Sequence, residues 1–367
     1  MSQPFYLESN YDRKKPLLIY GFGQLCVNFL LGLYTESIEV TAIFDANPKY
    51  HNTKICGIPV LPPDRIGEFN RESNVFISTR QGKFTFTKLF SDLGFRNFYY
   101  SFKREMQCYD LLISKKEENR GIIDLHSENI QRARSLFKEQ KSLDIFDARL
   151  NAHYNNDFIA LERLYSTPTD FPKDIFSFTE NEVFVDAGVW IGDSSCEFSN
   201  LVHGKYNFIH AFEPSEILAF VASRNFDLYN IKNIELHPYA LYDREGAVSF
   251  DQDLTFQGLV AGRVSNTGSL TVPCTSLDIF FKTRGGGGLP SIIKMDIEGS
   301  EVAALSGARK IIGEAMPKLA ICVYHKLEDL WEVPNKISEA QTGKGYDYHL
   351  RHQGSFYDTL LFASPIK

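Results

Sequence analysis

The chain has 367 residues, of which 43% are hydrophobic and 23% charged, and a net charge of −7 at pH 7. This composition is typical of a globular protein, and the length favours about two domains. The acidic balance argues against a nucleic-acid partner, because polyanions are bound by basic surfaces. No apolar run is as long as a membrane span, and residues 1–16 are polar, unlike a signal peptide.

Cysteine usage points to a reducing compartment. The six cysteines are scattered and form no Cys-x-x-Cys pair, a pattern that favours free thiols over disulfides or a zinc site. We therefore expect a cytoplasmic protein.

Residues 1–105 are predicted to form a small Rossmann-like α/β domain. An apolar strand at 17–20 leads to Gly21-Phe-Gly23, a helical run at 24–34 and a second strand at 40–44 that ends in Asp45. This order resembles a dinucleotide-binding βαβ unit, in which glycines approach a pyrophosphate and the acid meets a ribose. Cys26 stands at the third glycine position, so the fingerprint is incomplete. Two alternatives stay open: a ligand site at Gly21, Gly23 and Asp45, or a scaffold domain.

Residues 106–175 are predicted to form a mainly helical connector. The mixed charges of residues 128–141 at helical spacing indicate a solvated helix face. Pro168 and Pro172 then mark the entry into a second domain, which we place at 176–367.

The second domain opens with a buried strand at 183–186, which ends in Asp186. Gly188 and Gly192 follow, before a helical run at 193–203. Glycine is needed where the backbone approaches a ligand closely or adopts positive φ. The stretch therefore predicts a loop that holds a polar small molecule.

Further strands repeat this arrangement. They are predicted at 207–212, 234–237, 291–296 and 318–324. An ionisable residue stands at the carboxyl end of four predicted strands: Asp186, Glu213, Asp296 and His325. In open α/β sheets the ligand crevice lies beyond these ends, so the convergence predicts an active site.

The carboxyl-terminal half resembles the FkbM-type methyltransferases, which are a branch of the class I S-adenosylmethionine-dependent enzymes. The resemblance rests on the following stretches: Val185-Asp-Ala-Gly-Val-Trp-Ile-Gly192, Phe212-Glu-Pro214, Ala240-Leu-Tyr-Asp243, Thr275-Ser-Leu-Asp278, Ile293-Lys-Met-Asp-Ile-Glu-Gly-Ser-Glu301 and Tyr324-His325. Trp190 departs from the pattern, since the family usually has a small polar residue such as Asn there.

The resemblance implies a seven-stranded, mostly parallel sheet that ends in an antiparallel pair, here residues 348–351 and 359–363. It also implies S-adenosylmethionine as cofactor. We expect the following residues to bind it: Asp186, Gly188, Gly192, Glu213, Pro214, Ala240 and Asp296.

Methyl transfer to a hydroxyl needs a base close to the acceptor. His325 has the best intrinsic pKa for this role, ~6.5, and Asp296 is the rival, either as the base or as the residue that orients His325. Lys294 and Glu298 are expected to set the local charge. We predict no metal, because no tight ligand spacing occurs; an ion between Asp296, Glu298 and His325 is the less favoured alternative.

We therefore predict an S-adenosylmethionine-dependent O-methyltransferase that acts on a hydroxyl of a sugar, in a surface glycan or a glycosylated metabolite. The expected partner is a small-molecule or glycan acceptor, and a homo-oligomer is compatible with the sequence. Two alternatives use the amino-terminal domain: an NAD(P)-linked oxidoreductase and a nucleotide-sugar-binding scaffold.

Overall fold

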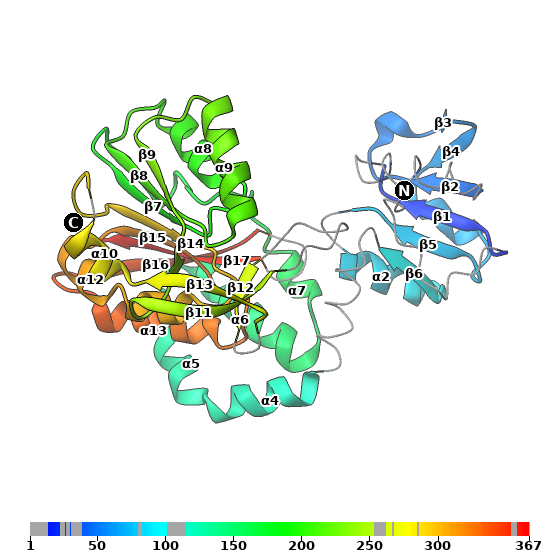
Figure 1. Cartoon of the computed structure of the whole chain (residues 1–367). Helices are drawn as coiled ribbons and strands as arrows, with labels where there is room; N and C mark the ends of the chain where they lie inside the picture. Colours follow the sequence, from blue (N-terminus) through cyan, green and yellow to red (C-terminus); the bar gives the residue numbers. More distant parts are fainter. Residues whose placement is uncertain are drawn as a thin grey trace. The chain divides into compact units, whose positions relative to one another are not determined.

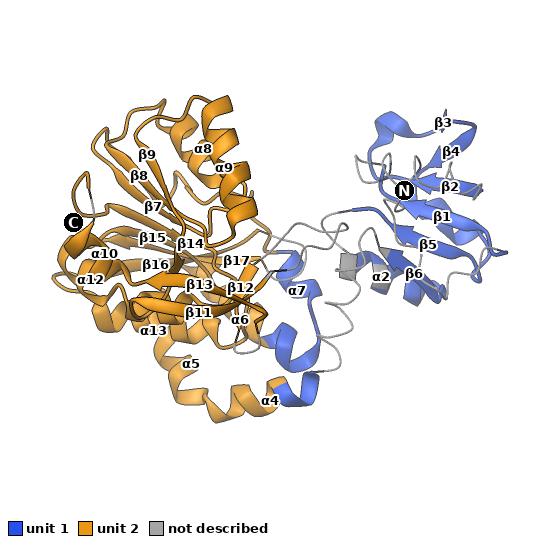
Figure 2. Cartoon of the chain, viewed as in Figure 1, with its two compact units in different colours: residues 1–118, 151–163, 354–356 blue, residues 119–150, 164–353, 357–367 orange. Residues whose placement is uncertain are grey.

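The structure is a computed structural model that describes residues 14–22, 26, 30, 39–79, 83–100, 115–252, 262–265, 268–284, 286–353 and 358–366. The chain divides into two compact units (Figure 2), one made of residues 1–118, 151–163 and 354–356, the other of 119–150, 164–353 and 357–367. The expected connector is not a third unit, since its residues are divided between these two.

Unit 1 contains a six-stranded sheet with the order β3-β4-β2-β1-β5-β6. Its strands are β1 (Leu17–Tyr20), β2 (Val40–Phe44), β3 (Thr53–Ile55), β4 (Ile58–Leu61), β5 (Asn74–Ile77) and β6 (Asn97–Tyr100). Its helices are η1 (Pro48–Tyr50), η2 (Pro63–Glu68), α2 (Lys83–Asp92) and α7 (Ile159–Glu162). β1 pairs in parallel with β2 and β5, as a Rossmann-like domain requires. Of the helix expected at 24–34, only Cys26 and Leu30 are described, and both are helical.

Unit 2 is organised around a seven-stranded sheet with the order β16-β17-β15-β14-β7-β8-β9 (Figure 1). These strands are β7 (Val183–Ala187), β8 (Phe208–Phe212), β9 (Ile234–His237), β14 (Ile292–Met295), β15 (Lys318–Cys322), β16 (Tyr346–His352) and β17 (Thr359–Pro365). β17 pairs antiparallel with both β15 and β16. The predicted sheet and its antiparallel pair are confirmed.

The chain runs outward from the middle of this sheet in both directions. β7, β8 and β9 follow one another towards one edge, whereas β14 and β15 continue towards the other. Because parallel crossovers are right-handed, the helices of the two halves cover opposite faces. α8 (Asp193–Leu201) and α9 (Glu216–Leu228) belong to the first half, and α12 (Arg309–Ala315) and α13 (Asp329–Ala340) to the second. The order reverses between β7 and β14, where such folds bind ligands.

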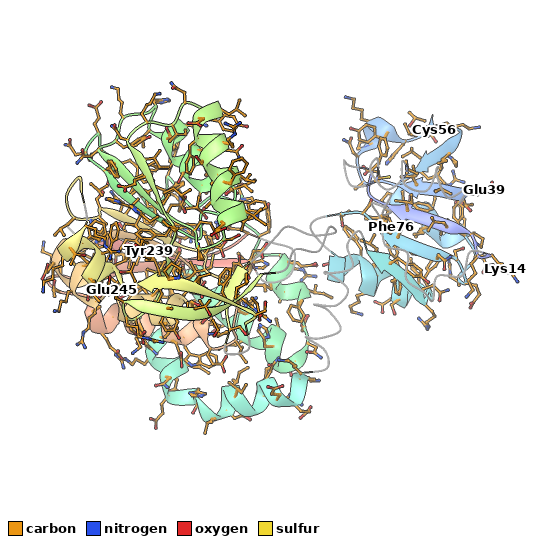
Figure 3. All side chains as sticks on the ribbon, in the orientation of Figure 1. Lys14, Glu39, Cys56, Phe76, Tyr239 and Glu245 are labelled. Atoms are coloured by element: carbon orange, nitrogen blue, oxygen red, sulfur yellow. The ribbon has the colours of Figure 1, made fainter. Side chains whose placement is uncertain are left out.

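A second, four-stranded sheet was not predicted from the sequence. It has the order β10-β13-β11-β12 and is built from β10 (Ala240–Leu241), β11 (Gly246–Gln252), β12 (Gly262–Val264) and β13 (Leu270–Thr275). α10 (Leu277–Thr283) follows it, with Ser276 as the N-cap. Arg284, just after α10, donates to Glu245 at 2.8 Å and lies over the ring of Tyr239; Figure 3 labels both partners.

The expected connector contains three helices, of which the second packs on α13. They are α4 (Lys116–Leu125), α5 (Ser127–Arg134) and α6 (Gln140–Asn155). Asn335 of α13 donates to the carbonyl of Asn129 in α5 at 3.0 Å, and Trp331 lies against the ring of His126. Trp331 is fully buried, so α13 is part of the core.

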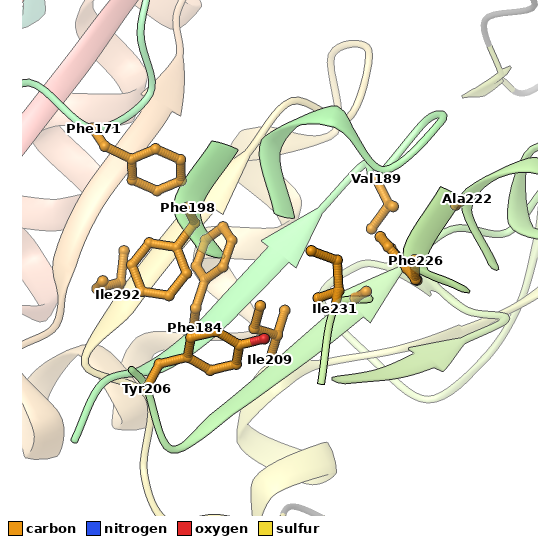
Figure 4. Packing of buried hydrophobic residues seen from close by; sticks show 11 residues of the cluster. Phe171, Phe184, Val189, Phe198, Tyr206, Ile209, Ala222, Phe226, Ile231 and Ile292 are labelled. Carbon is orange, nitrogen blue, oxygen red and sulfur yellow. The ribbon is translucent and has the colours of Figure 1, made fainter. Parts of the chain in front are cut away.

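Aromatic side chains fill the core between β7, β8 and their helices (Figure 4). Phe184 of β7 lies 4.9 Å from Phe198 of α8, measured between ring centroids, and Phe171 contacts both rings. Burying such rings stabilises the fold by about 1.5–3 kcal/mol for each side chain. The segment that carries Phe171 is therefore fastened to the first strand of the sheet.

The segment between β14 and β15 forms two helices, α11 (Glu301–Ser306) and α12, separated at Gly307. A Cβ on Gly307 would lie 2.3 Å from the carbonyl oxygen of Tyr242. The chain bends there because only glycine allows this close approach. Asp278 then accepts hydrogen bonds from the amides of Lys310 and Ile311, which caps α12 from a neighbouring helix.

Two expectations from composition can be compared with the described residues. Cys26, Cys56, Cys196, Cys274 and Cys322 are all free thiols, and Cys56 is exposed near the β3–β4 turn (Figure 3). Among the helices of the described ranges, none is long and apolar enough to cross a bilayer.

Candidate functional site

The loop after β7 approaches the end of β14 more closely than any side chain allows. Gly188 has φ +76, and a Cβ there would lie 1.8 Å from the carbonyl oxygen of Asp296. Gly192 has φ +86, and its Cβ would lie 2.6 Å from the ring of Phe226. Both predicted glycines are therefore required by the backbone path itself.

The buried side chain of Lys294 supports this loop from the neighbouring strand β14. Lys294 lies beside Asp186 on the neighbouring strand, and its ammonium is 3.4 Å from that carboxylate. The ammonium also donates to the carbonyl of Gly188 at 2.9 Å. Burial opposes its charge, yet Asp186, Asp296 and Asp170 outweigh burial and raise the pKa of Lys294 well above its usual value. Lys294 therefore remains charged and holds the loop through its hydrogen bond to Gly188.

Asp186 has no exposed surface, and Ser194 and Ser195 donate to its other oxygen at 2.7 and 2.6 Å. We expected Asp186 to contact the cofactor and Lys294 to be catalytic. The geometry gives both residues a positioning role, since Lys294 holds the loop and one oxygen of Asp186 is bonded to two serines. The other oxygen of Asp186 has an ion pair with Lys294 but no hydrogen bond within the described residues, so its contact with the cofactor stays a prediction.

Glu213 fastens the same loop to the end of β8. Its carboxylate accepts hydrogen bonds from the amides of Trp190 at 3.1 Å and Ser215 at 2.9 Å. Burial raises the pKa of Glu213 to about 7, despite these bonds. A carboxylate oxygen has two acceptor sites, so Glu213 retains the capacity to accept from a ribose hydroxyl.

Trp190 has φ +51, a left-handed conformation in which a bulky side chain is a genuine outlier. Asn tolerates this conformation, so this backbone suits the small polar residue that the resemblance led us to expect better than it suits Trp. Strained residues of this kind are concentrated at ligand sites.

The loop after β14 and the end of β15 bring four ionisable side chains together. The ring nitrogens of His325 lie 3.3 Å from Asp296, 3.6 Å from Glu298 and 3.0 Å from Glu301. Glu298 has φ +54, so this backbone is also strained. Tyr324 donates to Asp296 at 3.2 Å.

These contacts change the protonation of His325. Burial would lower its pKa, but Asp296 and Glu301 outweigh burial and raise the pKa well above its usual value. Burial would raise the pKa of Asp296, whereas His325 and Lys294 together hold it below its usual range. At neutral pH the imidazole is therefore a cation, which cannot serve as the general base that we expected.

The sequence reasoning did not single out Asp170, which is half-buried and interacts electrostatically with residues of the site. Thr169 exchanges hydrogen bonds with Gln353 at 3.2 and 2.8 Å, and Phe171 is held in the aromatic core. Between these anchors Asp170 interacts with Lys294, Asp296 and Asp186, and burial raises its pKa to about 7. Its only sequence signal is its place between Pro168 and Pro172, because it does not follow a strand.

The remaining predicted residues lie in different surroundings. Pro214 is half-buried directly after Glu213, at the end of β8. Ala240 is buried in the core of the four-stranded sheet, with Val248 and Cys274 among its neighbours. Its side chain is therefore a packing residue, and a contact of Ala240 with the cofactor stays a prediction.

The amino-terminal residues form a compact turn of their own. Gly21 has φ +97, and Asp45 accepts from the amides of Phe22 at 2.6 Å and Asn47 at 2.7 Å. Both oxygens of Asp45 thus hold the backbone. Gly23 lies outside the described residues, and ligand binding at this turn stays a prediction.

The comparisons with known proteins agree with this geometry. Residues 186–348 match the family model described as "Methyltransferase FkbM domain". A methyltransferase FkbM from Methylobacillus flagellatus KT is structurally similar, with 22% identity, a TM-score of 0.61 and coverage of 99% of this chain and 95% of that chain. The comparison with curated proteins found no match.

Two further solved structures are similar over about half of the chain. An rRNA methylase from Streptococcus thermophilus has 14% identity, a TM-score of 0.33 and coverage of 51% of this chain and 89% of its own. A precorrin-6y C5,15-methyltransferase from Geobacter metallireducens GS-15 has 10% identity, a TM-score of 0.34 and coverage of 55% and 94%.

Substituting Gly188 by Ala tests the close approach of the loop to β14. Gly204 has φ +70 and nothing within 4 Å of a Cβ, so Gly204→Ala is a control with the same strain and no clash. We expect Gly204→Ala to cost about 1–2 kcal/mol of unfolding free energy and Gly188→Ala at least ~2 kcal/mol more, as measured by urea denaturation. Equal losses would show that the two strands are not in contact as described.

Substituting Trp190 by Asn tests the strain in the loop. The backbone amide that reaches Glu213 is retained, and Asn tolerates positive φ, so we expect the unfolding free energy to rise by about 1 kcal/mol. Urea denaturation provides the measurement. A decrease would mean that packing of the indole outweighs the backbone strain.

Proposed function

We propose that this protein, whose residues 186–348 form a methyltransferase FkbM domain, is an S-adenosylmethionine-dependent O-methyltransferase. The observation that carries the proposal is the convergence of the Gly188 loop, Glu213, Asp296 and His325 at the carboxyl ends of β7, β8, β14 and β15. This edge includes the reversal point of the sheet, where ligands of such folds bind.

The charge of the site favours a cationic cofactor. The charges of Asp170, Asp186 and Asp296 all act on the ammonium of Lys294. S-adenosylmethionine carries a positive sulfonium, whereas NAD carries a negatively charged pyrophosphate. Like charges brought together without compensation are unfavourable, so this edge of the sheet discriminates against a dinucleotide.

The residues fit the cofactor in a second respect. Gly188 and Gly192 leave backbone, not side chain, along the loop, and Glu213 lies at the end of the next strand with acceptor capacity for a ribose. When bound, the cofactor supplies an activated methyl group. The protein then has to hold the acceptor hydroxyl in line and remove its proton.

Two carboxylates are candidates to accept that proton. Asp296 is the rival base from the sequence, but its pKa is held low by His325 and Lys294, so it is a weak base. Asp170 has a pKa of about 7, which matches the pH at which a base works best. We assign proton acceptance to Asp170, and orientation of the hydroxyl to Asp296 and His325.

A sugar or a glycosylated metabolite is the proposed acceptor. The support is the resemblance to FkbM-type enzymes, together with the chemistry of the exposed groups. The side chains of Asp296 and Glu298 are 35% and 32% exposed, and carboxylates accept hydrogen bonds from vicinal hydroxyls.

Calorimetric titration of the full chain tests the cofactor. We expect S-adenosylmethionine to bind with one equivalent per chain, and NADH and UDP-sugars to bind far more weakly or not at all. Glu213→Gln is expected to weaken the cofactor by about tenfold, or 1.4 kcal/mol. Tight binding of NADH alone would establish the oxidoreductase alternative, and binding of UDP-sugars alone the scaffold.

Substituting Asp170 by Asn tests the base. The carboxylate accepts a proton only above its pKa, so kcat/KM of the wild type is expected to fall as pH drops below about 7. Asp170→Asn is expected to lower kcat by about 10²–10⁴ and to abolish this pH dependence.

Asp174→Asn, in the same segment but paired with Arg351, is the control and should retain activity. The assay follows S-adenosylhomocysteine release with a panel of sugars and glycosides. An unchanged pH profile in Asp170→Asn would transfer the base role to Asp296.

A further inference from the structure

The cluster around His325 combines ligand types that bind divalent metals. One donor atom each from Asp296, Glu301 and His325 lie within 4.8 Å of one another. The side chain of Glu298, at the rim, comes within 3.6 Å of the same ring. Ligand atoms around a first-row divalent ion lie roughly 3–4 Å apart, since each bond is about 2.1 Å long. Nε2 of His325 lies 3.3 Å from Asp296 and 3.6 Å from Glu298, which falls in this range. The 3.0 Å contact of Glu301 is with Nδ1, so its place in the same donor set rests on the 4.8 Å limit.

The imidazole is buried and its nitrogens are incompletely satisfied. The His325 side chain is 9% exposed, and neither ring nitrogen makes a well-aligned hydrogen bond with the described residues. One oxygen of Glu301, which has no exposed surface, is in the same situation. Buried polar atoms normally have a partner, so these atoms indicate that a group is to be held between them.

The charge balance supports a cation. Asp186, Asp296 and Glu301 carry three negative charges. Lys294 of β14 forms an ion pair with Asp186 and also interacts electrostatically with Asp296. A metal ion bound to His325 takes the place of the proton that the ring otherwise holds, and without that proton this group of residues has a net negative charge. Burying such charge is costly unless a cation compensates it.

The backbone is shaped for this cluster. Glu298 has φ +54 and Gly299 φ +96, so two successive residues adopt left-handed conformations directly after Asp296. Backbone strain of this kind persists where contacts with the surrounding structure hold the residues in place. Here the turn keeps Glu298 beside His325 and starts α11 at Glu301, so that three acids reach one imidazole.

We propose that Asp296, Glu301 and His325, with Glu298 at the rim, form a binding site for one divalent metal ion. One imidazole among carboxylates suits Mn²⁺, Fe²⁺ or Zn²⁺ better than Mg²⁺ or Ca²⁺, which prefer oxygen ligands alone. The side chains of Asp296 and Glu298 are a third exposed, so the ion keeps open positions. Within the proposed function, on which this role rests, a hydroxyl of the acceptor occupies one of them.

Titration of the metal-free full chain with Mn²⁺, followed by electron paramagnetic resonance without cofactor, tests the site. We expect one ion per chain. His325→Ala and Asp296→Asn are expected to weaken binding by about 100-fold or more, and Glu301→Gln by about 10- to 100-fold. His349→Ala is the matched control, because His349 also contacts a carboxylate, Glu139, which Arg351 already neutralises; its affinity should be unchanged.

Circular dichroism of each variant identifies loss of fold, and Asp296→Asn is decisive if His325→Ala does not fold. The proposal is overturned if the wild type binds no Mn²⁺ at about 1 mM, a free energy of ~4 kcal/mol, or if the folded variants bind as tightly as the wild type. S-adenosylmethionine binding is measured separately. If the wild type binds Mn²⁺ but does not bind S-adenosylmethionine, the proposed function is overturned and the metal site is still supported.

Discussion

The contact on which the site depends is the buried ammonium of Lys294. It is shared between the carboxylate of Asp186 and the carbonyl of Gly188, and so joins β14 to the loop after β7. Removing one partner of a buried pair leaves an uncompensated charge, which costs about 3–5 kcal/mol. The same contact fixes the height of the glycine loop above the sheet, so stability and ligand binding share one interaction.

From this contact the site extends in two directions. On one side Glu213 ties the loop to β8 through the amide of Trp190. On the other side Asp296, held by Lys294 and His325, connects the loop to β15. Each acid is thus both a structural acceptor and part of the charge that a cofactor meets. These acids therefore hold the site together through their contacts within the protein, and they still contribute negative charge to the ligand site.

Much of the fold could be predicted from the sequence. Apolar runs located β7, β8, β9, β14 and β15 within two residues at most ends, because buried parallel strands have a strong local pattern. The four-stranded sheet was missed: β10 and β12 have only two and three residues, and the longer β11 and β13 were not recognised either. Likewise the break at Gly307 depends on the carbonyl of Tyr242, which is far away in sequence.

For the site, the sequence by itself determined which residues stand at the carboxyl ends of the strands, since strand ends and glycines are local features. Tertiary structure alone decided what these residues do. It buried Asp186 against Lys294, moved Ala240 into another core, surrounded His325 with acids and brought in Asp170. The physical reason is that pKa values and roles depend on burial and on nearby charges. Both arise from contacts between segments that are far apart in the sequence, and the sequence has no local pattern that predicts these contacts.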